Sequence, residues 1–353
     1  MAWRLIGHRY DGKVVMKVVK YAFLPLLIAG AAGGLRVPFQ PWFSPAEASA
    51  TMLASPPPID GERAYGYLKQ IVEIGPHTAG SEANTRVRKL VADHFTKMGG
   101  KVREQPFRAV HPMTGKPLLM VNLVASWKPE NLQRVVIGAH YDTRPHPDQE
   151  ALPDRRNLPF VGANDPGSGI AVLMEIANHL NNLDTQWGVD LVLFDGEELV
   201  FGNDPRVGEY FLGSDEFARV YIEQRDRRRS KMRYAAGMVL DMVGGRDLRI
   251  KQEPNSVDAA PQLVRQVWDV ARSLRVDSFR REMGREVMDD HLALIRAGIP
   301  TIDIIDFDYP YWHKADDLPE NCSADSLADV GRVVTTWLTL PPPKAEQPRK
   351  RRR

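Results

Sequence analysis

Apolar residues along the middle of the chain follow two periods, and segments of the two kinds alternate. Short apolar runs, typical of buried strands, lie at residues 135–140, 189–194, 238–243 and 301–305. Apolar residues at helical spacing predict helices at residues 169–183, 214–228, 261–274, 291–297 and 324–340. Strands that alternate with helices of this length indicate a mainly parallel sheet with helices on both faces.

An additional group of elements precedes this alternation. Periodic apolar residues predict helices over 61–74 and 81–98, the second with a capped start at Ser81. Two strands are then expected over 101–110 and 119–127. The predicted fold class is therefore α/β, as a single globular domain whose central sheet is mixed but mainly parallel.

Composition limits the classes of protein that the chain can represent. Its 353 residues, 43% of them hydrophobic, suffice for one large core and are few for two. The net charge of +2 is too small to indicate a nucleic-acid partner. Cys322 is the only cysteine, so no intrachain disulfide forms, and we interpret it as structural.

The two ends of the chain differ from the middle. Basic residues precede an apolar stretch at 21–35, which predicts that residues 1–35 are a signal peptide or an N-terminal membrane anchor. Residues 36–58, rich in Pro, Ala and Ser, are expected to be a linker, and 59–340 the catalytic domain. Residues 341–353 form a basic tail. This organisation predicts export to the bacterial periplasm or the extracellular space, with membrane attachment as the alternative to cleavage.

The candidate chemistry begins at the end of one predicted strand. The run at 191–194 is followed by Asp195, Gly196 and the adjacent carboxylates Glu197 and Glu198. Open α/β sheets bind ligands at the carboxyl ends of their strands. Neighbouring acids repel each other there unless a cation or a shared proton separates their roles.

Other strand ends carry the same kinds of side chain. His140 and Asp241 end or nearly end predicted strands, Asp165 follows a glycine turn, and His313 follows the last strand. Asp142, two residues after His140, is expected to share its face and orient its imidazole. Each residue alone has a plainer interpretation, as a core histidine, a helix cap or an acidic loop. Carboxylates and imidazoles that converge from several strands are typical of a zinc site.

The order of these motifs resembles the zinc peptidase family M28, and within it the glutaminyl cyclases. The resemblance covers roughly 61–340 and includes an aspartate-histidine pair at 289–291. Features similar to the cyclases are Phe160-Val-Gly-Ala before Asp165, the loop from Glu198 to 210–214, and Trp312-His313 followed by Asp316-Asp317. Phe201 stands where animal cyclases have a tryptophan, and the turn at 166–169 is similar to the peptidases.

The resemblance implies specific roles. In a glutaminyl-peptide cyclotransferase, which converts N-terminal glutamine to pyroglutamate and releases ammonia, the ligands of a single zinc ion would be Asp165, Glu198 and His313. Glu197 would be the proton shuttle, with Asp241 and Asp289 as a hydrogen-bonded acidic pair beside it. Trp312 and Tyr309 would line the pocket that binds the glutamine side chain. His291 is expected to orient a neighbour rather than bind metal.

Two other hypotheses remain open at this point. In a two-zinc aminopeptidase, Asp165 would bridge the ions, His140 and Asp241 would be further ligands, and Glu197 would activate water. For both enzymes the partners are the N-termini of peptides or proteins. A catalytically silent binding domain is the third hypothesis, but its expected sign, the loss of metal ligands, is absent from this sequence. The oligomeric state is not indicated.

Overall fold

The computed structural model describes residues 5–10, 13–18, 58–201, 208–227 and 230–341. Six strands form its central sheet. The sheet strands are β3 (Lys101–Val110), β4 (Pro117–Trp127), β5 (Gln133–His140), β6 (Gly188–Phe194), β9 (Arg233–Asp241) and β12 (Thr301–Ile305). Their order is β12-β9-β5-β6-β4-β3. β12, β9, β5 and β6 run parallel, whereas β4 pairs antiparallel with both β6 and β3. The predicted fold class, with a mixed and mainly parallel sheet, is confirmed.

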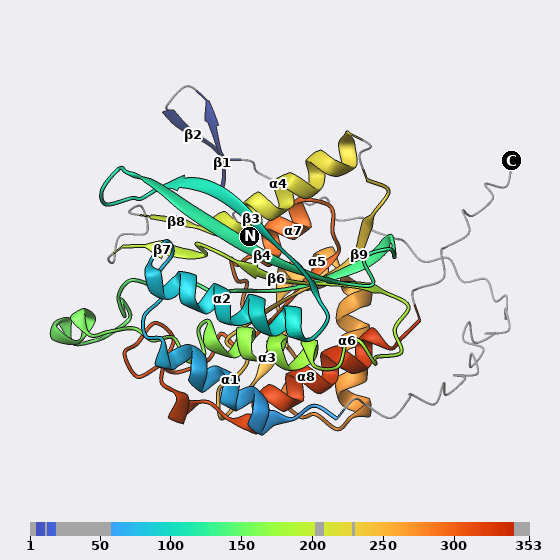
Figure 1. Ribbon diagram of the computed structural model, residues 1–353. Coiled ribbons are helices and arrows are strands. Elements are labelled where there is room, and N and C mark those ends of the chain that lie inside the picture. Colours follow the sequence, from blue (N-terminus) through green and yellow to red (C-terminus); the bar gives the residue numbers. More distant parts are fainter. Residues whose placement is uncertain (1–4, 11–12, 19–57, 202–207, 228–229, 342–353) are drawn as a thin grey trace, which may run out of the picture. The chain divides into compact units, whose positions relative to one another are not determined.

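Helices cover both faces of this sheet (Figure 1). One face carries α1 (Gly61–Glu73), α2 (Glu82–Lys97), α3 (Gly167–Ala177), α6 (Pro261–Ser273) and α8 (Ala324–Leu338). The other carries α4 (Leu212–Asp226) and α7 (His291–Arg296). The short helix α5 (Pro254–Ala259) and the 3-10 turns Pro153–Asn157 and Pro319–Asn321 complete the helical segments of the described chain. The Ser81 side chain caps α2 by accepting a hydrogen bond from the Asn84 N–H, as predicted.

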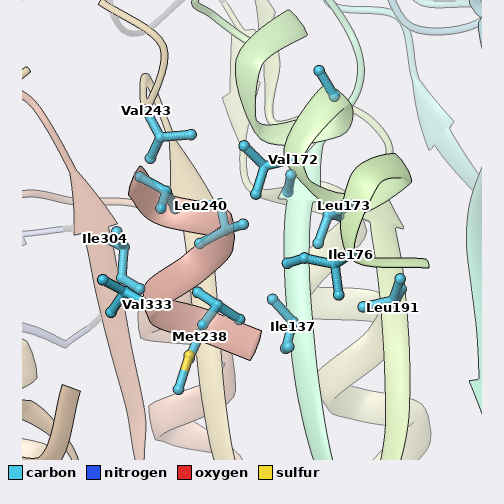
Figure 2. Close-up of a cluster of buried hydrophobic side chains, with 14 of the residues drawn as sticks. Ile137, Val172, Leu173, Ile176, Leu191, Met238, Leu240, Val243, Ile304 and Val333 are labelled. Carbon is cyan, nitrogen blue, oxygen red and sulfur yellow. The ribbon is translucent and has the colours of Figure 1, made fainter. Parts of the chain in front are cut away.

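Alternation along the parallel strands divides the core into two layers. On β5, Ile137 packs in the larger apolar cluster under α3, while Val136 packs in the smaller one under α4 and α7. Figure 2 shows the larger cluster, in which Val172 and Ile176 of α3 lie over the sheet and Val333 of α8 lies beside Ile304 of β12. Because successive strand residues point to opposite faces, strands buried on both sides are apolar throughout.

The structure corrects several predicted boundaries. The strand expected at 238–243 spans Arg233–Asp241 and ends where Met242 adopts a positive φ of 48°. The helix expected over 169–183 ends at Ala177, and residues 178–182 form turns. The strand pairs β7 (Glu198–Val200) with β8 (Gly208–Tyr210) and β10 (Ile250–Gln252) with β11 (Phe279–Met283) were not predicted. Runs of three to five residues are too short to display a period.

The N-terminal residues 1–51 form a separate unit. Within it, β1 (Leu5–Tyr10) pairs antiparallel with β2 (Lys13–Val18). The apolar stretch at 21–35 lies outside the described residues, as do all but the last residues of the linker predicted at 36–58 and all but the first residue of the tail predicted at 341–353. Their assignments stay predictions. Among the described residues, no helix combines the length and apolar character that crossing a membrane requires.

Candidate metal centre

The carboxyl ends of the parallel strands bring the predicted site residues to one edge of the sheet. His140 is the last residue of β5, and Asp241 is the last of β9. Glu197 and Glu198 follow β6, which lies beside β5. His313 comes from the loop after β12, where its backbone has a positive φ of 52°. Residues held in this sparsely populated conformation occur often at functional sites.

Asp165, Glu198 and His313 form one compact group. Each offers a ligand atom within 4.8 Å of those of the other two, and all three are buried. The His313 Nε2 atom lies 2.7 Å from Glu198 Oε1 and 3.6 Å from Asp165 Oδ2. The structure therefore brings together the three residues expected to hold the first zinc ion.

The backbone around Asp165 is fixed by a second carboxylate. Asp317 accepts hydrogen bonds from the N–H groups of Asn164 and Asp165, at 2.9 and 3.0 Å. The turn before Asp165 requires glycine at Gly162, since φ is +59° and an added Cβ would lie 1.9 Å from the Asp165 carbonyl oxygen. Gly169 lets α3 approach the sheet closely, because a Cβ there would lie 2.5 Å from the Leu240 carbonyl oxygen.

Asp142 positions the two glutamates rather than the His140 ring, which corrects the predicted role. Its Oδ1 atom accepts hydrogen bonds from the N–H groups of Gly196 and Glu197 at 2.8 and 3.0 Å, and its Oδ2 atom from Glu198 at 3.1 Å. The His140 Nδ1 atom faces the Asp142 carbonyl oxygen at 3.2 Å. Strand alternation does not extend to Asp142, because β5 ends at His140.

His140, Asp165 and Asp241 form a second group with ligand atoms within 4.8 Å of one another. The His140 Nε2 atom lies 3.1 Å from Asp165 Oδ1 and 3.3 Å from Asp241 Oδ1. These are the residues expected to bind a second ion, with Asp165 common to both groups. The geometry is thus compatible with one metal ion or with two.

Asp289 and His291 belong to a buried polar cluster close to Asp241. The His291 ring is fully buried, with Nδ1 3.5 Å from Asp303 Oδ2 and Nε2 3.3 Å from Glu253 Oε2. His291 lies outside both groups around Asp165, but with Asp289 and Asp303 it forms a further buried group whose ligand atoms lie within 4.8 Å of one another. Its expected role of orienting a neighbour stays a prediction. Burial and the charge of Asp241 raise the pKa of Asp289 to about 6. Asp303 and Glu253, which no sequence motif indicated, are the additional members of this cluster.

Burial and neighbouring charges shift the pKa values of the two adjacent glutamates, Glu197 and Glu198, in opposite directions. Burial, together with the charges of Glu198 and Asp289, raises the pKa of Glu197 well above its usual range. Burial alone would also raise the pKa of Glu198, but His313 and Arg144 lower it to about 2. At neutral pH the side chain of Glu198 is therefore ionised, as a metal ligand would have to be, whereas Glu197 takes up a proton more readily.

A cavity of about 420 Å³ opens in front of these residues and is lined by Glu197, Glu198, Asp241, Asp289 and His313 among others. Trp312 also lines it, as expected, beside Phe307, with the ring centroids 4.9 Å apart. Tyr309 does not, which corrects its predicted place: its buried hydroxyl donates a 2.8 Å hydrogen bond to Asp317. Phe307, the buried Arg144 and the partly buried Asp148 were missed by sequence reasoning, because irregular loops give no periodic signal.

The residues present fit a zinc ion. Two carboxylates and an imidazole are typical protein ligands of catalytic zinc, which keeps a further position for substrate or water. Glu198 Oε1 accepts a hydrogen bond from Arg144, while the buried Oε2 atom has no hydrogen-bond partner. Since buried polar atoms are nearly always partnered, this oxygen is available to bind an ion.

Comparisons with known proteins agree with this geometry. The family model described as Peptidase family M28 matches residues 122–338. The crystal structure of Fimbriiglobus ruber glutaminyl cyclase is 36% identical with a TM-score of 0.78, over 81% of this chain and 97% of that chain. A leucine aminopeptidase precursor from Bacteroides thetaiotaomicron is 30% identical with a TM-score of 0.75, over 81% of this chain and 99% of that chain. The glutaminyl-peptide cyclotransferase-like protein of Bos taurus is 25% identical over 303 residues, which are 77% of this chain and 73% of that protein.

Proposed function

Because the chain belongs to peptidase family M28, we propose that it is a zinc-dependent glutaminyl-peptide cyclotransferase. It converts the N-terminal glutamine of peptides or proteins to pyroglutamate and releases ammonia. The observation that carries this proposal is the similarity to a glutaminyl cyclase at 36% identity over 97% of that chain. Its support in the site is the group of Asp165, Glu198 and His313, with an additional carboxylate, Glu197, in the same cavity.

The reaction closes a ring within the substrate. The α-amine nitrogen forms a bond to the γ-carbon of the glutamine side chain, and the bond from that carbon to its amide nitrogen breaks. Asp165, Glu198 and His313 would hold the zinc ion, which would supply a Lewis acid to polarise the γ-carbonyl group. The substrate's own chain holds the two reacting atoms close together, so much of the entropy cost is already met.

Glu197 has the position and the charge environment of the proton shuttle. It accepts the proton that the α-amine loses and gives a proton to the departing nitrogen, which leaves as ammonia. A carboxyl whose pKa is raised well above its usual range by burial performs both steps near neutral pH better than an ordinary glutamate. The N–H bonds to Asp142 hold the backbone of Glu197 in place.

The aromatic side of the cavity suits the hydrocarbon part of a glutamine side chain. Trp312 packs against both Phe307 and His313, with ring centroids 4.9 and 4.0 Å apart. Placing the glutamine against these rings brings its γ-carbonyl towards the metal ligands. The cavity thus supports binding of one small, neutral side chain beside acidic groups that attract the α-amine.

A two-zinc aminopeptidase is the second candidate function. The observation that favours it is the second group of ligand atoms, in which His140 and Asp241 share Asp165 with the first group. In such an enzyme Glu197 would take the proton of an attacking water. Zinc content separates the two candidates, since one tightly held ion supports cyclisation and two support hydrolysis.

The test of the proposed function uses two peptides that differ only in the first residue, glutamine or leucine. The purified full chain, loaded with zinc, is incubated with each and the products are read by mass. We expect the glutamine peptide to lose one ammonia and the leucine peptide to stay intact. Release of free leucine, with no ammonia from the glutamine peptide, would assign the chain to the aminopeptidases.

Glu197→Gln tests the shuttle within the same assay. Removal of a general acid–base group costs typically 10²–10⁴-fold in rate, and we expect a fall of about this size in ammonia release. The bound zinc should stay unchanged, because the ligand group contains Glu198 and not Glu197. Full ammonia release by the variant would show that another group carries the proton.

A further inference from the structure

Arg144 occupies an unusual place for a cation, buried beside the candidate zinc ligands. Its side chain is 4% exposed and lies in the loop just after β5. The Nη1 group donates a 2.9 Å hydrogen bond to Glu198 Oε1. The Nη2 group donates to Asp148 Oδ2 at 3.1 Å and to the Tyr210 hydroxyl at 3.1 Å. A planar guanidinium holds several acceptors at once in fixed directions.

Asp148 carries the connection onward to a second ligand. Its Oδ1 atom lies 3.0 Å from His313 Nδ1, the ring nitrogen that faces away from Glu198. The next residue, Gln149, donates its backbone N–H to the His313 carbonyl oxygen at 3.1 Å. Arg144 therefore contacts Glu198 directly and reaches His313 through Asp148, so that one cation joins two of the three ligands.

We infer that Arg144 and Asp148 are positioning residues that hold Glu198 and His313 ready to bind zinc, and thereby set the affinity for the ion. Arg144 holds Glu198 Oε1, while Glu198 Oε2 has no hydrogen-bond partner in the described residues, and Asp148 holds the His313 ring through the contact of its Oδ1 atom with Nδ1. Groups that orient metal ligands in this way affect metal affinity strongly. The inference rests on the zinc site of the proposed function, and it holds for a cyclase and for an aminopeptidase alike.

The sign of the change in zinc affinity distinguishes positioning from simple charge. A cation near a zinc site repels the ion, so neutralising Arg144 would tighten binding if only charge mattered. If Arg144 acts by positioning, its loss frees the ligands and weakens binding. Lysine keeps the charge but lacks the fork that contacts Glu198 and Asp148 together. The glutamine and lysine variants therefore give different patterns under the two explanations.

The experiment measures zinc dissociation constants of the full chain by competition with a chelator. We expect Arg144→Gln and Arg144→Lys each to bind zinc about 10- to 100-fold more weakly, as is typical when partners of metal ligands are removed. Asp148→Asn should weaken binding in the same range, because it loses the charged partner of His313. Tighter zinc binding by Arg144→Gln, or wild-type binding by Arg144→Lys, would overturn the inference.

Arg155 provides a matched control in the same part of the chain. Its guanidinium pairs with Glu150 and Asp316 at 3.0 and 2.7 Å, yet touches none of the three ligands. Arg155→Gln should leave zinc affinity unchanged.

Thermal melting of the metal-free variants separates loss of folding from loss of positioning, and Asp148→Asn remains a test if an Arg144 variant does not fold. Wild-type zinc affinity in Asp148→Asn would overturn the role of Asp148. A failed cyclisation assay with this affinity pattern intact would count against the proposed reaction alone.

Discussion

At the scale of single residues, Trp312 is the side chain with the most direct expected effect on substrate binding. It lines the cavity beside Phe307 and covers His313. Truncation to alanine removes apolar contact worth about 1.5–3 kcal/mol. We therefore expect Trp312→Ala to raise the KM for a glutamine-initiated peptide by about 10-fold or more, with a smaller change in kcat.

The matched variant is Trp312→Phe, which keeps a ring against the cavity and should stay within a few-fold of the wild-type KM. Bound zinc is measured for both variants, because the Trp312 ring also contacts His313. An unchanged KM in Trp312→Ala with full zinc content would mean that the substrate does not lie against this wall.

The residues that sequence reasoning located share a property that the missed residues lack. Glu197, Glu198 and Asp241 stand at or just after the ends of strands, where a change from apolar to acidic is visible in one dimension. Arg144 and Asp148 lie in an irregular loop, and their importance comes only from contacts with Glu198 and His313. The role expected for Asp142 was wrong for a related reason, since the period of a strand holds only as far as the strand itself.

At the scale of elements, Glu175 of α3 connects this helix to α1 through hydrogen bonds. It is almost fully buried on α3, and it accepts hydrogen bonds from the Asp60 N–H at the start of α1 and from Arg63 Nε at 2.7 Å. The His179 Nε2 atom lies 2.9 Å from the same carboxylate. Burial would raise the pKa of Glu175, but the bonds from His179 and Arg63 lower it to about 2.

This shift makes the attachment of α1 depend on pH in a defined direction. A carboxyl with a lowered pKa contributes stability above its unfolded value of about 4.5 and loses it as the pH falls towards 2. For Glu175→Gln we expect a loss on the order of 3 kcal/mol in the free energy of unfolding at neutral pH. The difference from wild type should shrink as the pH falls from about 4.5 to about 2.

Urea unfolding at a series of pH values measures this difference. Glu73, exposed on α1, supplies the control, because Glu73→Gln should differ from wild type by a small and nearly constant amount. If the difference in unfolding free energy between Glu175→Gln and wild type stayed the same down to about pH 2, the carboxylate charge would not be what holds α1 in place.

The elements themselves were more predictable than their pairing. The strands at 189–194 and 301–305 agree with β6 and β12 within one residue, because buried parallel strands are continuous apolar runs. Their neighbours in the sheet cannot be read from such runs. β3 and β4 precede β5 in the chain, yet β6 lies between β4 and β5. The order of strands in the sheet depends on contacts between segments that are distant in the sequence, and local periodicity does not indicate those contacts.

At the scale of the whole molecule, the acidic centre is separate from the apolar core. The large cluster in Figure 2 fills the space between the sheet and α1, α2, α3, α6 and α8. Asp165, Glu198 and His313 lie at one edge of the sheet and converge from segments almost 150 positions apart. The motif order in the sequence predicted the family because part of the site lies at or after the end of each parallel strand. The distances between those parts depend on the complete fold.

This separation predicts how the protein responds to removal of zinc. The core on both faces of the sheet requires no metal, so the metal-free chain should keep its helices and strands. Zinc at 1,000 times its dissociation constant stabilises the folded state by about 4 kcal/mol. For a domain somewhat larger than 150–250 residues, that corresponds to a rise in Tm of at most about 8–16 °C. In the metal-free protein, burial and the negative charge of Glu198 raise the pKa of Asp165 to about 6. Zinc would relieve the repulsion between these two carboxylates, and this relief is part of the expected stabilisation.

Circular dichroism with and without a chelator measures both quantities, the helical content and the Tm. Asp165→Asn is the matched control, since it replaces a ligand at nearly constant volume and should melt at the same temperature whether or not zinc is present. The same variant reports on the acidic centre itself, because a neutral amide at this position should raise the Tm of the metal-free protein above that of the wild type. If chelation unfolded the wild-type chain outright, the apolar core could not be the independent scaffold described above, and the metal would have to be counted among the forces that form the fold.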